Sequence, residues 1–226
     1  MCGRFTLTTP IETLVESFGI ETAAEGISPR YNIAPTQPVA TVLDEGEGRR
    51  LALLRWGLIP GWAKDPSIGN RMINARAETV AEKPAFRAAF QRRRCLVLSD
   101  GFYEWQKVEQ GKRPMYIRMK DGLPFAFAGL WERWRSPNGS TVDSCTILTT
   151  DPNELMRPIH NRMPVILPPE AYELWLDPAV QTPGPLLQLL RAYPVEEMEA
   201  YPVSPRVNNP ANDDPLCIEP VTQTGA

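Results

Sequence analysis

Short apolar runs separated by turn-forming residues follow one another along most of this chain, and this pattern constrains the fold more than any other feature. Several runs are joined by dipeptides such as Asp121-Gly122 and Asn138-Gly139, which are typical of tight β-hairpins. Because most connections are of hairpin length, with a few helices between the strands, the sequence indicates an antiparallel α+β fold. The predicted strands cover residues 38–43, 51–56, 73–79, 95–98, 102–107, 114–119, 123–134, 145–149 and 163–167.

Helices are predicted where a capping residue precedes a helical apolar pattern. In the first of them Thr9 can cap the helix, Glu12 can complete a capping box and Gly19 can end the helix. Further helices are predicted over residues 84–92, 151–160 and 169–176.

The length of the chain, 226 residues, suits a single hydrophobic core, and no repeat or linker divides it. We therefore expect one domain over residues 1–226, with a frayed tail at about 219–226. The four cysteines lie far apart and there is a single histidine, which argues against a zinc site of the usual spacing. With no signal peptide and no apolar run of membrane length, we expect a cytoplasmic protein with free thiols and without a metal or an organic cofactor.

The net charge of −3 argues mildly against a nucleic-acid-binding protein. Any DNA-binding surface would therefore have to be a local basic patch. Three consecutive arginines at residues 92–94 are interpreted as the solvated end of a predicted helix rather than as such a patch.

Cys2 can become the amino terminus of the protein, because the initiator Met1 is normally removed when a small residue follows it. The α-amine would then have a pKa of about 7.7–8.0 and be partly neutral at neutral pH. Such an amine attacks aldehydes to give an imine, and the adjacent thiol can then close a five-membered thiazolidine ring. The alternative is that Cys2 is an unimportant residue at a frayed chain end.

Two titratable side chains could assist that chemistry. Glu104 is flanked by aromatic residues after a predicted buried strand, so its carboxyl group could be desolvated and suited to acid–base catalysis. His160 lies at the break between a predicted helix and an apolar strand, and could exchange protons near neutral pH. Taken individually, the two are better interpreted as a solvent-facing carboxylate and a structural histidine.

Polar and aromatic residues suggest where a ligand could bind. Asn74 and Arg76 share one face of a predicted strand, where an amide and a guanidinium could bind sugar or phosphate oxygens. The alternative is the wet face of a half-buried strand. We assign Trp56 to the core and expect Trp62 to be the exposed ring that could stack on a base.

Seven sequence blocks, each a weak signal alone, occur in a fixed order between residue 2 and about residue 220. They are Met1-Cys2-Gly3-Arg4-Phe5, Arg30-Tyr31-Asn32-Ile33-Ala34-Pro35, Trp56-Gly57-Leu58-Ile59-Pro60-Gly61-Trp62, Asn74-Ala75-Arg76-Ala77-Glu78-Thr79, Asp100-Gly101-Phe102-Tyr103-Glu104-Trp105, Ile159-His160-Asn161-Arg162-Met163-Pro164 and Val203-Ser204-Pro205-Arg206-Val207-Asn208. As a set they closely resemble the SOS response-associated peptidase (SRAP) family. The resemblance implies a single α+β domain with a mainly antiparallel, barrel-like sheet and peripheral helices.

The resemblance also implies a function. Members of the family crosslink to abasic sites in single-stranded DNA and so protect the lesion. Cys2 matches the residue that forms the thiazolidine once the protein has removed its own Met1. Asn74 matches the amide that holds the abasic sugar and the Cys2 terminus. Glu104 matches the acid–base carboxylate beside the α-amine, and His160 matches the imidazole that helps to open the sugar ring.

The DNA contacts follow from the resemblance in the same way. Arg4, Arg76 and Arg162 match positions that contact DNA phosphates, and Trp62 matches an aromatic residue presented to the bases near the lesion. Ala63 stands where some members carry a second tryptophan, so stacking on one side of the lesion is expected to be weaker. The expected partner is single-stranded DNA that contains abasic sites, bound by a monomer.

Two other functions fit a free Cys2 or the basic residues. In an amino-terminal nucleophile hydrolase, the Cys2 thiol would attack an amide and its own α-amine would act as the base. In a non-catalytic single-strand-binding protein, Trp62 and the arginines would bind DNA without forming a covalent bond.

Overall fold

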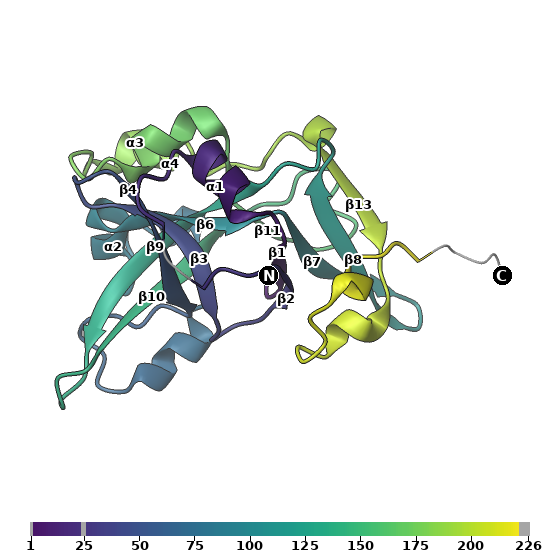
Figure 1. Ribbon diagram of the computed structural model, residues 1–226, viewed down its shortest axis with the longest axis horizontal. Helices are drawn as coiled ribbons and strands as arrows, with labels where there is room; N and C mark the ends of the chain where they lie inside the picture. Colours follow the sequence, from purple (N-terminus) through teal and green to yellow (C-terminus); the bar gives the residue numbers. More distant parts are fainter. Residues whose placement is uncertain (1, 24–25, 222–226) are drawn as a thin grey trace.

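Five strands close into a ring, which forms a barrel on one side of the molecule (Figure 1). In ring order they are β10 (Thr141–Thr150), β4 (Arg49–Trp56), β3 (Pro38–Asp44), β6 (Arg94–Ser99) and β9 (Phe125–Arg135). The pairing of β9 with β10 closes the ring, and β10 and β4 run parallel while the other four pairings are antiparallel. The computed structural model, which describes residues 2–23 and 26–221, thus confirms the mainly antiparallel, barrel-like α+β architecture.

A second, fully antiparallel sheet stands beside the barrel. Its strands, in spatial order, are β13 (Met198–Pro202), β8 (Gly111–Met119), β7 (Gly101–Val108), β1 (Phe5–Leu7) and β2 (Arg30–Ile33). The ring of Phe5 packs edge-on against Trp56 and Phe127 of the barrel, at centroid distances of 5.0 and 5.7 Å. The first strand therefore lies where the sheet meets the barrel, and it brings the start of the chain to that junction.

Asp100 joins the two sheets where β6 passes into β7. Its carboxylate accepts hydrogen bonds from the hydroxyl of Thr6 and from the backbone N–H groups of Thr8 and Thr9. The turn between the sheets and the segment after β1 are thereby fixed to each other, which sets the position of the first residues.

Three short strands extend the barrel. They are β5 (Asn74–Arg76), β11 (Met163–Pro164) and β12 (Ile166–Leu167). β5 and β11 pair with β10, whereas β12 pairs with β9. The strand predicted over residues 163–167 is therefore divided at Val165, whose backbone bonds to both neighbouring strands.

Helices lie at the periphery of the molecule, as expected (Figure 1). The α-helices are α1 (Ile11–Phe18), α2 (Arg87–Arg92), α3 (Tyr172–Leu176) and α4 (Pro183–Leu187). The 3-10 helices are η1 (Pro66–Arg71), η2 (Ala77–Thr79), η3 (Pro169–Ala171), η4 (Val195–Glu197), η5 (Pro205–Asn208) and η6 (Pro215–Cys217). Among the residues that the structure describes, no helix has the length and apolar character needed to cross a bilayer.

The first helix ends as predicted but begins differently. Gly19 adopts the left-handed conformation, with φ of 59°, that lets glycine end a helix. Thr9 does not cap the helix, because its hydroxyl donates to Asp100, and the N-cap residue is Pro10, which makes no side-chain cap hydrogen bond.

Two other element predictions are wrong. Residues 151–160 form turns rather than a helix, because Pro158 lacks the N–H group that a continuing helix would need. The strand predicted over residues 73–79 ends at Arg76, after which the chain turns into η2.

The interpretation of residues 92–94 as solvated is wrong for Arg94. This side chain is buried, and its guanidinium donates to the carbonyls of Phe90, Gln91, Trp175 and Asp177. Arg94 therefore holds α3 against the barrel rather than facing solvent.

Candidate functional site

Cys2 is buried near the junction of the two sheets, three residues before β1 begins at Phe5. Its carbonyl oxygen accepts a hydrogen bond from Nδ2 of Asn74 at 2.8 Å. Burial raises the pKa of the Cys2 thiol, and the nearby negative charge of Glu104 raises it further. The thiol is therefore protonated at neutral pH, and the structure places an amide and a carboxyl group around the second residue.

Asn74 reaches Cys2 from the barrel. It lies on β5, which runs parallel to β10 and sets Asn74 opposite Ile147. The Oδ1 atom of Asn74 is buried and has no hydrogen-bond partner within the described part of the chain. Because an unpaired buried acceptor is costly, this oxygen is suited to receive an N–H or O–H group from a ligand or from a freed amino terminus.

Glu104 reaches Cys2 from the second sheet. It lies on β7 and is only 3% exposed, in contrast to the solvent-facing carboxylate of the alternative interpretation. Burial raises the pKa of Glu104 to about 7. At neutral pH this carboxyl group exists in both protonation states, which suits a group that must both accept and donate a proton.

His160 follows the turns that replace the predicted helix. Nδ1 of His160 lies 3.1 Å from the backbone nitrogen of Arg162 and 3.3 Å from the carbonyl oxygen of the same residue, so either tautomer of the neutral ring has a backbone partner at Nδ1. Burial lowers the pKa of His160, which favours the neutral form. Nε2 of Gln106 donates to the carbonyl of Pro158 at 3.2 Å, which ties the His160 turn to β7, the strand that carries Glu104.

The predicted basic residues lie in different environments. Arg76 is exposed at the end of β5. Arg162 is largely covered, with 12% of its side chain exposed, and it forms ion pairs with Glu78 and Asp151.

Arg4 serves a structural purpose that the sequence did not indicate. Its guanidinium donates to Oδ1 of Asn32 at 2.8 Å and to the carbonyl of Val207 at 2.7 Å, and it lies over the ring of Trp105. Arg4 therefore joins the first residues of the chain to β2, β7 and η5. Its contact with DNA stays a prediction.

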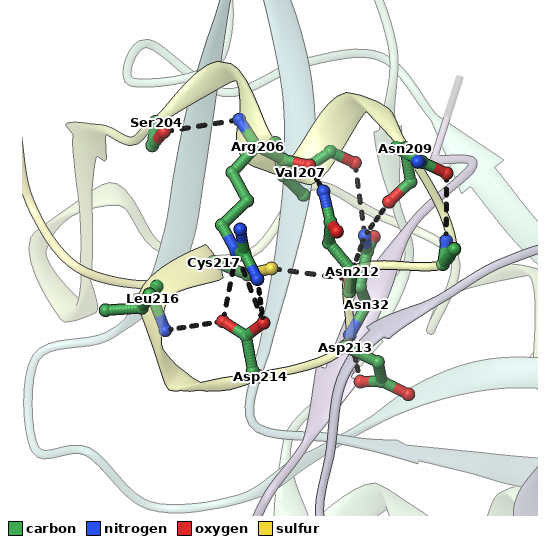
Figure 2. Close-up of polar contacts among 11 residues, drawn as sticks. Asn32, Ser204, Arg206, Val207, Asn209, Asn212, Asp213, Asp214, Leu216 and Cys217 are labelled. Atoms are coloured by element: carbon green, nitrogen blue, oxygen red, sulfur yellow. Dashed lines mark hydrogen bonds and ion pairs between the residues drawn. The ribbon is translucent and has the colours of Figure 1, made fainter.

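The structural role of Asn32 is not evident from any single motif in the sequence. The residue is fully buried, and Nδ2 donates to the carbonyls of Val207, Asn209 and Asn212, as Figure 2 shows. Its presence in one of the seven blocks was the signal that could have revealed it. The blocks around Arg4, Asn32 and Val207 meet at this point.

The two tryptophans of one block have the environments that the sequence predicted. Trp56 is fully buried and its Nε1 donates to the carbonyl of Ile73, whereas Trp62 is 63% exposed. An exposed indole can stack on a base, and that role stays a prediction.

The candidate site residues fall into two groups, the catalytic residues around Cys2 and the predicted DNA-binding residues, which are Arg4, Trp62, Arg76 and Arg162. Cys2, Asn74 and Glu104 come together at the junction of the sheets, with His160 tied to the same strand as Glu104. Within the described ranges, no cluster of three or more His, Cys, Asp or Glu side chains could hold a metal ion. The arrangement can carry out acid–base chemistry at the second residue of the chain.

Comparisons with known proteins show the family of the chain. A family model described as SOS response associated peptidase (SRAP) matches residues 1–210. The chain is 50% identical over 222 residues to the abasic site processing protein YoqW of Bacillus subtilis (strain 168), and the match covers 97% of this chain and 99% of that protein. It is 35% identical over 227 residues to the abasic site processing protein HMCES of Xenopus tropicalis, covering 87% of this chain and 67% of that protein. A crystal structure of a protein from Bacteroides thetaiotaomicron has a TM-score of 0.89 and 27% identity, and covers 98% of this chain and 100% of that one.

Proposed function

The chain belongs to the SOS response-associated peptidase family, and from that premise we propose that it processes abasic sites by forming a covalent bond to them. The bond joins the amino-terminal Cys2 to the ring-opened abasic sugar in single-stranded DNA. It shields the lesion during the DNA damage response. The relatives YoqW and HMCES, both named abasic site processing proteins, support this proposal.

The observation that carries the proposal is the buried carboxyl group of Glu104 beside Cys2. Burial raises its pKa to about 7, and its charge acts on the Cys2 thiol. An amine that attacks an aldehyde must lose a proton, and the oxygen that leaves must gain one. A carboxyl group that titrates near neutral pH can perform both transfers in turn.

The proposed reaction has three steps. Hydrolysis of the Met1–Cys2 peptide bond, which the protein performs on itself, frees the α-amine of Cys2. The amine adds to the C1 aldehyde of the open sugar, and one water molecule leaves to give an imine. The Cys2 sulfur then adds to the imine carbon while the thiol proton passes to the nitrogen, which closes a thiazolidine ring.

The other site residues open the sugar, position the Cys2 terminus and bind the DNA strand. His160 promotes opening of the closed sugar by acting on its ring oxygen, and Asn74 holds the Cys2 backbone and offers Oδ1 to the freed amine. Arg4, Arg76 and Arg162 contact the phosphates, and Trp62 stacks on a neighbouring base. The protein acts as a cytoplasmic monomer and needs no metal or organic cofactor.

A denaturing gel with an abasic oligonucleotide tests the proposal. Wild-type protein should give a complex that survives denaturation without any reductant. Cys2→Ser keeps an amine but has a much poorer nucleophile for ring closure, so its complex should survive only after borohydride treatment. A variant with extra residues before Cys2 should form neither complex, since an amide nitrogen cannot form an imine.

The same samples separate the two rival functions. An amino-terminal nucleophile hydrolase would hydrolyse glutamine and form no DNA adduct. A passive single-strand-binding protein would shift the oligonucleotide in a native gel but leave it free in the denaturing one. A stable adduct at the normal rate with a blocked Cys2 would mean that another residue is the nucleophile.

A further inference from the structure

Two carboxylates occupy the guanidinium of Arg162. Nη1 donates to Oε1 of Glu78 at 2.7 Å and to Oδ1 of Asp151 at 2.9 Å, while Nη2 donates to Oε2 of Glu78 at 2.9 Å. Nη2 also donates to the carbonyl of Thr149 at 2.6 Å. Glu78 therefore holds Arg162 in the two-pronged geometry with which arginine binds a phosphate.

We propose that Glu78 and Asp151 form a carboxylate cover on Arg162, which a phosphate of the DNA strand must displace. The proposal rests on the proposed function only in taking single-stranded DNA as the ligand. Only 12% of the Arg162 side chain is exposed, against 46% for Glu78 and 86% for Asp151. The carboxylates therefore meet the solvent, and a phosphate can reach the guanidinium only after they have moved.

The charges around the cover cancel. The hydrogen bond from Arg162 lowers the pKa of Glu78, and the charge of Arg76 acts in the same direction, so Glu78 stays ionised at neutral pH. Arg76 and Arg162 together match the two carboxylates in charge. An intact strand thus meets a neutral patch, and the cover lowers the affinity for undamaged DNA.

The cover is weak enough to be displaced. Ion pairs with exposed partners contribute little free energy because water and salt screen them. Asp151 makes a single contact with Arg162 and is the more exposed of the two carboxylates, so it is expected to leave first. A strand held at the lesion by its bond to Cys2 would keep the phosphate in place long enough to exchange.

The test measures binding of an intact single-stranded oligonucleotide, without an abasic site, by fluorescence anisotropy over a series of salt concentrations. Glu78→Gln and Asp151→Asn keep the shape of each side chain but remove its charge. Each should tighten binding roughly two- to fivefold, which is the effect expected of an exposed ion pair. Glu78→Gln should also steepen the dependence of log affinity on log salt by about 0.7, the slope for one further phosphate neutralised.

Glu45→Gln is the matched control. Glu45 lies in the turn between β3 and β4, is also 46% exposed, and forms an ion pair with Arg50 on β4. Because β4 runs parallel to β10 and sets Trp56 beside Cys145, that turn lies at the other end of the barrel from Thr149. Glu45→Gln changes the net charge equally and should leave the salt slope unchanged.

The outcomes distinguish this proposal from the proposed function. Weaker binding by Glu78→Gln would mean that the carboxylate holds Arg162 in its DNA-binding position, and would overturn the cover. Binding equal to that of Glu45→Gln would overturn it as well. Asp151→Asn, at an almost fully exposed position, decides the question if Glu78→Gln does not fold. A failure to crosslink abasic DNA would refute the proposed function without altering these results on intact strands.

Discussion

Glu104 is almost completely buried, and this burial raises the pKa of its carboxyl group to about 7. Its neighbour Cys2 is buried as well, so in the proposed reaction a proton that leaves the Cys2 thiol has no direct path to bulk water. A nearby acceptor is then required, and Glu104 is the group whose charge acts on Cys2.

Replacement of this carboxyl group should separate chemistry from binding. Glu104→Gln keeps the size of the side chain but cannot take a proton, so crosslinking should slow by roughly 10²–10⁴ while DNA affinity is unchanged. Single-turnover gels at saturating abasic oligonucleotide measure the rate. Glu109→Gln, at an exposed position in the turn after β7, serves as control and should react at the wild-type rate. A Glu104→Gln protein as fast as the control would refute the acid–base role.

The same variant should change the pH dependence of stability. Burial raises the pKa of Glu104 from 4.5 to about 7, so between these values the folded protein keeps a proton that the unfolded chain has lost. The free energy of unfolding therefore falls as pH rises through this window, by about 3 kcal/mol at most. Glu104→Gln is free of this loss, so its melting temperature relative to wild type should be higher at pH 8 than at pH 5. An equal difference at both pH values would contradict the buried titration.

The segment after β13, residues 203–221, lies across the second sheet and is called the strap below (Figure 2). Asn32 on β2 binds three carbonyls of this strap, and Asp213 accepts from the backbone N–H groups of Tyr31 and Asn32. Pro220 forms an isolated bridge with Val203, so this part of the predicted tail is held to the fold, while residues 222–226 lie outside the described residues. The strap fixes Arg4, two residues from Cys2.

Removal of the Asn32 side chain should loosen this strap. Asn32→Ala removes one acceptor of Arg4 and the donor to three carbonyls of the strap, and we expect a loss of about 2–4 kcal/mol in the free energy of unfolding. Asn208→Ala removes one exposed hydrogen bond, to Nε1 of Trp105, and should cost less than about 1 kcal/mol. Urea unfolding of both variants measures the difference, and equal losses would show that the strap does not depend on Asn32.

Local patterns predicted most strands of this fold but not how they close. Alternation and turn residues identify β3, β4, β6, β7 and β8, because those signals lie within a few residues. The parallel pairing of β10 with β4 joins segments about 90 residues apart, as in Cys145 opposite Trp56, and no local signal encodes it. The predicted helix over residues 151–160 followed a good start signal at Asp151, which Pro158 overrides.

For the candidate site, the sequence predicted the residues around Cys2 but not the partners of the arginines. The resemblance identified Cys2, Asn74 and Glu104, which the structure brings together. Three consecutive arginines gave no sign that Arg94 alone would be buried, because the carbonyls of Trp175 and Asp177 that satisfy it lie about 80 residues away. The carboxylates on Arg162 were missed for a similar reason, since Glu78 is distant in sequence.

The protein as a whole is acidic, whereas DNA, the partner implied by its relatives, is a polyanion. The net charge is −3, and several guanidinium groups, including those of Arg93, Arg133 and Arg162, already have carboxylate partners. The net charge therefore adds no general electrostatic attraction to DNA, and attraction has to come from local basic residues. The covalent bond that we propose at the lesion would keep the strand in place whatever the net charge.

The intact mass of the protein after reaction with an abasic oligonucleotide tests this account most directly. Wild-type protein without any reductant should gain the mass of the oligonucleotide less one water molecule, from a starting mass that lacks Met1. Digestion should place the modification on the amino-terminal peptide at Cys2. An unmodified protein, or an adduct on a lysine or on another cysteine, would contradict the account.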